Sequence, residues 1–150
     1  MKKVMLIAAL ALGFVLVFAC KSQQPAPAEP PTTEEALKNV YERYYAELIL
    51  DDAGTYIVKS GDTLAHIARN SDYHNGFYYP IIMLASRDVV LDPDKIEPGM
   101  ELIIPNLEKN LDNPRAKANI KDFLGEIAKI EDNRTRADTA KGMRDLADTL

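Results

Sequence analysis

The alternation of hydrophobic and polar residues predicts a β-strand near the middle of the chain. From Thr55 to Lys59 the residues are mainly β-branched or aromatic, with Tyr56 and Val58 on one face and Ile57 on the other. Successive side chains of a strand point to opposite faces, and such residues suit a pleated surface. We therefore expect a strand over this stretch.

A turn and a short helix are predicted directly after this strand. Gly61 permits a backbone turn that other residues resist, and Asp62 is a suitable N-cap for a helix. The apolar residues that follow have the i, i+3, i+4 spacing of one helical stripe. The helix should be about two turns long, and its inward face should comprise Leu64, Ile67 and Ala68.

A second helix is predicted from Phe77 to Ser86. Pro80 falls within its first turn, where the missing N–H of proline is tolerated. The apolar face of this helix should comprise Ile81, Ile82, Leu84 and Ala85.

A turn and a closing strand complete the central unit. Pro98-Gly99 fits the central pair of a type II turn, in which proline presets the first residue and glycine accepts positive φ at the second. Leu102 and Ile104 should share one face of the strand, and Pro105 lacks the N–H needed to extend the ladder. The order of elements is β-α-α-β.

This order of strands, helices and turns resembles the lysin motif (LysM) domain, and the resemblance runs from about Thr55 to Pro105. It implies an α+β fold that binds polysaccharides containing N-acetylglucosamine, either peptidoglycan or chitin, and has no catalytic activity. The family holds glycan between the loop after the first strand and the loop before the second. Carried onto this chain, the glycan-binding residues are Gly61, Asp62, Thr63, Leu64, Ile96, Pro98 and Gly99.

Three positions depart from the pattern of the family. The family often has tryptophan at Tyr79, asparagine at Ser86, and glutamine or lysine at Met100. One serine hydroxyl makes fewer hydrogen bonds than an asparagine amide. The turn residues would also be needed for folding alone. The alternative function is therefore an envelope scaffold or adaptor, in which a degenerate LysM fold and the helices that flank it bind a protein partner.

The amino terminus predicts export. Met1-Lys2-Lys3 is basic, and an unbroken apolar run from Val4 to Ala19 follows. This run is shorter than the roughly 20 residues that comfortably span a bilayer. We therefore expect a cleaved signal peptide at residues 1–19.

Cys20 is the only cysteine, and its position after Val17-Phe18-Ala19 resembles a bacterial lipobox. Lipidation of Cys20 would anchor the chain to a membrane; an uncleaved anchor or an incidental cysteine are the alternatives. Lys21 rather than aspartate follows, which favours the outer membrane with the protein facing the periplasm. Such placement points to bacterial peptidoglycan. The proline-rich residues 20–31 predict an extended tether.

Helical patterns flank the central unit at residues 54–106. Within residues 32–53, Thr32 and Glu35 have capping-box spacing, and a helix should run to about Asp51 with the apolar positions Leu37, Val40, Tyr41, Tyr44 and Leu48. The tyrosines should pack on another helix instead of forming a sugar-stacking platform.

Two more helices are predicted within residues 107–150. Asn113-Pro114 is a cap followed by an N1 proline, and the first helix should bury Ile120, Phe123, Leu124, Ile127 and Ile130. The second should start at about Thr135 and bury Ala140, Met143, Leu146, Ala147 and Leu150. We expect the flanking helices to pack together or against the LysM unit.

Charge argues against nucleic acid as a partner. Loss of Lys2 and Lys3 with the signal leaves 16 basic against 23 acidic residues, a net charge of −7. The basic residues near the carboxyl terminus alternate with acidic ones, as on a solvated helix face: Arg134, Arg136, Lys141 and Arg144 with Asp132, Asp138 and Asp145.

The chain offers few residues that are suited to catalysis. Both histidines, His66 and His74, lie within the LysM stretch, and Cys20 is assigned to lipid. No nucleophile and base stand in a recognisable arrangement, and two histidines without nearby cysteines do not predict a zinc site. We expect neither an enzyme nor a cofactor.

Overall fold

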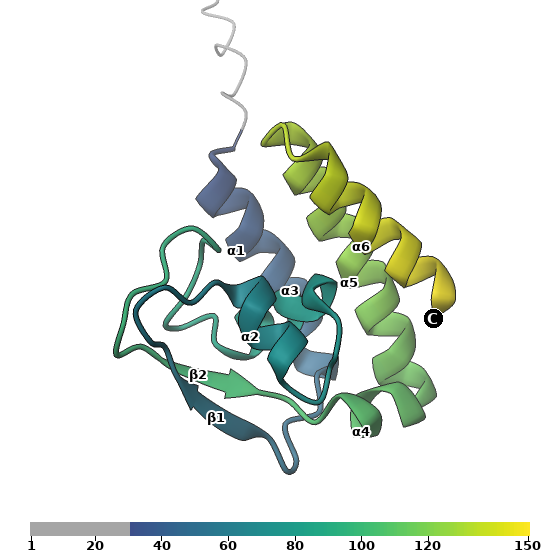
Figure 1. Ribbon diagram of the computed structural model, residues 1–150. Coiled ribbons are helices and arrows are strands. Elements are labelled where there is room, and N and C mark those ends of the chain that lie inside the picture. Colours follow the sequence, from purple (N-terminus) through teal and green to yellow (C-terminus); the bar gives the residue numbers. More distant parts are fainter. Residues whose placement is uncertain (1–30) are drawn as a thin grey trace, which may run out of the picture.

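The structure is a computed structural model that describes residues 31–150 (Figure 1). The predicted signal peptide, the lipidated Cys20 and all but the last residue of the tether lie outside the described residues. The described elements are α1 (Thr33–Tyr44), β1 (Gly54–Ile57), α2 (Leu64–Asn70), α3 (Tyr79–Ala85), β2 (Glu101–Ile104), α4 (Leu107–Asp112), α5 (Pro114–Asn133) and α6 (Ala137–Thr149). Short 3₁₀ turns follow α1 and precede α3, at Tyr45–Glu47 and Gly76–Tyr78.

Strands β1 and β2 form a two-stranded antiparallel sheet, although α2 and α3 separate them along the chain. Gly54 pairs with Ile104 and Ile57 with Glu101. The fold is therefore α+β, with a βααβ LysM core flanked by α1 and by α4 to α6, as the sequence predicted.

The predicted faces of the LysM core are confirmed. Val58 is buried and Ile57 is exposed, so the alternation along the first strand separates core from solvent. The predicted inward residues of α2 are all buried. Helix α3 is buried along its whole length, because α2, β2 and α5 pack against it.

Helix α1 begins as predicted and ends earlier than predicted. The capping box of Thr32 and Glu35 is present, but the helix ends at Tyr44 and the 3₁₀ turn at Glu47, so its extension to Asp51 is wrong. The reason is a distant partner. Asn110 accepts a hydrogen bond from the Ile49 amide (2.9 Å) and donates one to the Ile49 carbonyl (2.8 Å), which gives both backbone groups of Ile49 a partner outside the helix.

The flanking helices pack together and against the LysM core, as predicted. Helices α5 and α6 lie side by side (Figure 1), and α5 also contacts α1 and α3. The rings of Tyr41 and Tyr44 lie 6.1 and 5.6 Å from that of Phe123 in α5, which confirms that they pack on a helix. Asn113 caps α5 as predicted, whereas the short helix α4 before it was not predicted.

Candidate functional site

The two loops named by the sequence lie at the same end of the two-stranded sheet. Beyond the last strand pair, the Val58 amide donates to the Met100 carbonyl (2.9 Å), and the Gly99 amide donates to the Val58 carbonyl (2.9 Å). These bonds continue the pairing into the loops. They place the turn at Pro98-Gly99 beside the end of the first strand, where the loop containing Gly61 begins.

The first loop is held by Asp62, and here the sequence prediction was wrong. Asp62 does not cap α2; its carboxylate accepts hydrogen bonds from the Lys59 amide and from the Tyr56 hydroxyl, each 2.8 Å long. Because that carboxylate points back to the strand, the next residue caps the helix. Thr63 accepts a bond from the His66 amide at 3.2 Å.

These bonds also set the charge of the loop. The Lys59 amide first, and the Tyr56 hydroxyl second, lower the pKa of Asp62 below its ordinary value, because both stabilise the ionised carboxylate. The same contact raises the pKa of Tyr56. Both bonds end on the Oδ2 atom of Asp62, and no protein donor among the described residues bonds to Oδ1. The loop takes the positive φ that Gly61 was predicted to allow (87°).

The second loop confirms the predicted turn. The Met100 amide donates to the Glu97 carbonyl (3.1 Å), and Gly99 has a φ of 95°. These are the bond and the positive φ of a type II turn. Pro98 and Gly99 are exposed, whereas Ile96 packs against the hydrophobic core.

The seven predicted site residues differ in what they present to solvent. The exposed members are Gly61, Thr63, Pro98 and Gly99, and Asp62 and Ile96 are half-buried. Leu64 is only 2% exposed, so its side chain belongs to the core. Only its backbone is left to contact a ligand.

Ser86, a departure from the family pattern, has a defined structural role. It is buried, and its Oγ accepts a hydrogen bond from the Ile103 amide at 2.8 Å. Ser86 thus ties the end of α3 to β2, the strand that follows the second loop. One hydroxyl is enough to satisfy this amide.

Tyr56 is a residue of this site that the sequence did not single out. Its hydroxyl reaches Asp62, and its ring lies 5.7 Å from the Lys59 ammonium. With Asp62, Ile67 and Ile104 it lines a cavity of about 280 Å³ beside the two-stranded sheet. The sequence did place Tyr56 on the same strand face as the core residue Val58. No neighbouring residue indicated that the Tyr56 hydroxyl would bond to the loop.

A second cluster joins the LysM core to the carboxyl-terminal helices. Arg134 contacts Asp92 (2.9 Å) and Asp94 (2.5 Å), and Arg136 pairs with Asp94 and with Glu131 (3.4 Å). The Glu131 side chain is 0% exposed and that of Arg134 is 13% exposed. The prediction of a solvated face is therefore wrong for Arg134, because these acidic partners come from a distant loop.

The described part of the chain holds neither a metal-binding cluster nor a membrane-spanning helix. Among residues 31–150, no three His, Cys, Asp or Glu side chains are grouped so as to hold a metal ion, and His66 and His74 are exposed. Within the same range, no helix is both long and apolar enough to cross a bilayer.

Comparison with known families agrees with the geometry. Residues 56–105 match the LysM domain, and no catalytic family was detected. No curated protein and no solved structure matches the chain. A domain of this family implies binding of the glycans of peptidoglycan or chitin and a place at the cell wall, outside the cytoplasm. The chain therefore carries a LysM domain at residues 56–105, within which both candidate loops lie.

Proposed function

We propose that this chain is a non-catalytic lipoprotein that binds peptidoglycan through its LysM domain and links a membrane to the cell wall. The observation that carries the proposal is the pairing of the two loops at one end of the two-stranded sheet, within the matched LysM domain. Both loops have the positive-φ glycines and exposed backbone that close approach to a sugar requires.

The binding surface is built by the backbone more than by long side chains. Gly61, Pro98 and Gly99 leave little bulk over the loops, and Asp62 holds the first loop from within. Amide and carbonyl groups of these loops are suited to the N-acetyl and hydroxyl groups of the glycan, and Ile96 supplies an apolar edge.

The amino-terminal sequence favours peptidoglycan over chitin and adds the anchor. A signal peptide at residues 1–19 and a lipidated Cys20 would place the chain in a bacterial envelope, at the outer membrane and facing the periplasm. The tether from Lys21 to Pro31 reaches on the order of 34 Å if extended. Anchoring would confine the domain to a thin layer and raise its effective concentration at the wall.

Sedimentation with purified insoluble murein tests the binding. We expect the wild-type protein to sediment with murein, and Asp62→Ala and Pro98→Ala to sediment much less while remaining folded by circular dichroism. Asp148→Ala is the control, because Asp148 is an exposed carboxylate on α6 outside the matched domain. A folded wild-type protein that stays in the supernatant contradicts the proposal and favours the scaffold function.

Replacement of Cys20 tests the anchor separately. We expect the wild-type protein to fractionate with membranes and to incorporate labelled fatty acid, and Cys20→Ser to lose both properties. Murein binding by the purified variant should be unchanged, because the loops do not depend on the anchor. Incorporation of fatty acid by Cys20→Ser would show that the lipid is attached elsewhere.

A further inference from the structure

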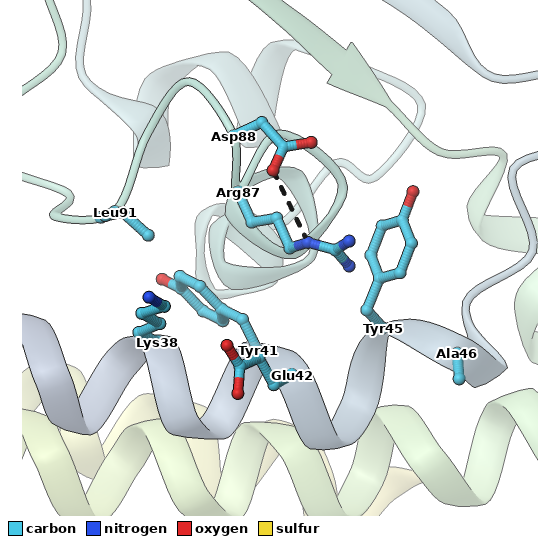
Figure 2. A pocket seen from close by; sticks show the side chains of 8 residues that line it. All are labelled: Lys38, Tyr41, Glu42, Tyr45, Ala46, Arg87, Asp88 and Leu91. Atoms are coloured by element: carbon cyan, nitrogen blue, oxygen red, sulfur yellow. Dashed lines mark ion pairs between the residues drawn. The ribbon is translucent and has the colours of Figure 1, made fainter.

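A cavity of about 560 Å³ lies between α1 and the loop that follows α3, outside the two candidate loops (Figure 2). Lys38 and Tyr45 line it from the α1 side, and Arg87, Asp88 and Leu91 line it from the loop. This loop continues from Leu91 through residues 92–95 to Ile96, so one segment connects the cavity to the second candidate loop.

The guanidinium of Arg87 stacks on an aromatic ring and has hydrogen-bond donors without a protein partner among the described residues. Its central carbon lies 3.3 Å from the centroid of the Tyr45 ring, a close stack. Its ion pair is with Asp88 through Nε at 3.9 Å, and that carboxylate is 92% exposed. Within residues 31–150, the two terminal nitrogens of Arg87 make no hydrogen bond. They form an oriented fork of the kind that binds a carboxylate through two parallel bonds.

The other charges around the cavity have both signs. Lys38 is exposed on α1, with its ammonium on the side that faces the loop (Figure 2), and it makes no ion pair among the described residues. Glu42 lies one helical turn further along α1, and Asp88 stands on the opposite wall. A ligand that fits this lining carries carboxylates and an amine, with small apolar groups between them for Tyr45 and Leu91.

We infer that this cavity binds the short peptide that peptidoglycan carries on its glycan, through a peptide carboxylate held by the Arg87 fork with Lys38 beside it. The inference rests on the proposed function and deepens it. Such a peptide has free carboxylates and an amine on its diamino acid, whereas chitin carries no peptide. The two sites together would make the chain select peptidoglycan over a bare N-acetylglucosamine polymer.

Three ligands test the inference by isothermal titration with the full chain. They are an N-acetylglucosamine oligomer, a soluble peptidoglycan fragment of matched glycan length that bears its peptides, and the free peptide. We expect the wild-type protein to bind the peptide-bearing fragment at least about tenfold more tightly than the oligomer. Arg87→Gln should reduce this ratio to about one without changing the affinity for the oligomer.

Two further variants guard against a folding artefact. Lys38→Gln changes an exposed residue and should lower the ratio in part. Arg43→Gln is the matched control. Like Lys38, Arg43 lies on α1, and like Arg87 it lies over a tyrosine ring, at 5.6 Å from that of Tyr44. It pairs with Glu126 and does not line the cavity. It should leave the ratio unchanged.

Equal affinity of the wild-type protein for both fragments, or a preference that survives Arg87→Gln, would overturn the inference while leaving the proposed function intact. If no glycan binds, the proposed function fails, and titration with the free peptide then tests the cavity alone. Binding of that peptide that depends on Arg87 would support the cavity as its site, and no binding at millimolar concentration would overturn it.

Discussion

The two ends of the LysM unit use charged side chains in opposite ways. At the loop end, Asp62 is solvent-accessible and bonds only to groups of its own strand and loop. At the junction with α5 and α6, Glu131 is buried and the Arg134 side chain is only 13% exposed, and Arg134 pairs with Asp92, which is far away in the sequence. Residues of the first kind fix the shape of a local loop, and residues of the second kind hold two parts of the molecule together.

The effect of a substitution should depend on which of these two ends it changes. An exposed hydrogen-bonded carboxylate contributes little to the free energy of unfolding, because solvent replaces its partners. A buried charge that loses its partner keeps the full cost of desolvation. Substitutions at the junction should therefore unfold the protein, and substitutions at the loops should leave it folded with altered binding.

Arg134→Ala should cause the largest loss of stability among the substitutions considered. Removal of this guanidinium leaves Asp92 and the buried Glu131 with fewer counter-charges, and we expect a loss of about 3 kcal/mol in the free energy of unfolding. Urea denaturation measures it. The control is Arg144→Ala, which breaks an exposed pair with Asp132 and should cost about 1 kcal/mol or less. Equal effects of the two variants would contradict a special role for the junction.

Ser86→Ala tests the buried link between α3 and β2. The substitution leaves the Ile103 amide without the oxygen that now accepts its hydrogen bond at 2.8 Å. We expect a loss of about 1 kcal/mol, at the lower end of the cost of an unsatisfied donor, because this amide is only partly buried. Thermal or urea unfolding provides the measurement. Unchanged stability would mean that another acceptor, or water, reaches this amide.

Two helical glycines give a matched pair with opposite expected signs. A Cβ at Gly142 in α6 would overlap the Phe77 ring of the LysM core, whereas a Cβ at Gly125 in α5 meets nothing within 4 Å. Gly125→Ala should stabilise by about 1 kcal/mol through helix propensity. Gly142→Ala should destabilise by about 1 kcal/mol, because displacement of Phe77 outweighs the same gain. Stabilisation by both would show that Phe77 does not join the two parts.

The smallest effect belongs to the loop end and depends on pH. The folded-state pKa of Asp62 lies below its unfolded value of 3.8, so its contribution to stability is present above that pH and is lost as pH falls through the folded pKa. The amide proton shift of Lys59 should therefore titrate with a midpoint below 3.8. Asp62→Asn should abolish this titration. A midpoint at or above the ordinary value would contradict the observed bonding.

Local patterns predicted the parts of the fold that local chemistry decides. Gly61 and Gly99 have the positive φ that their turns require, and the capping box at Thr32 and the Asn113 cap are both present. Each of these depends on residues within a few positions of one another. The same is true of the helical faces, where spacing alone selects the buried residues.

The errors and omissions arise where a distant residue decides the structure. Ile49 leaves the helix because Asn110 bonds to its backbone, and the Arg134 side chain is largely shielded from solvent because Asp92 and Asp94 reach it from the LysM core. The stack of Arg87 on Tyr45 is likewise formed by residues far apart in the sequence. At the candidate site the turns were predicted, the role of Asp62 as a cap was wrong, and the glycan contacts remain predictions.

The pairing of Gly54 with Ile104 also has a topological consequence. The chain enters and leaves the LysM unit at neighbouring points, while α1 before it and α5 after it meet through Tyr41, Tyr44 and Phe123. The unit is therefore an insert whose two ends are already closed by the helices that flank it. A pull on the amino terminus would be shared between β1 and the α1–α5 contact, so the load on the two-stranded sheet would not rest on a single strand.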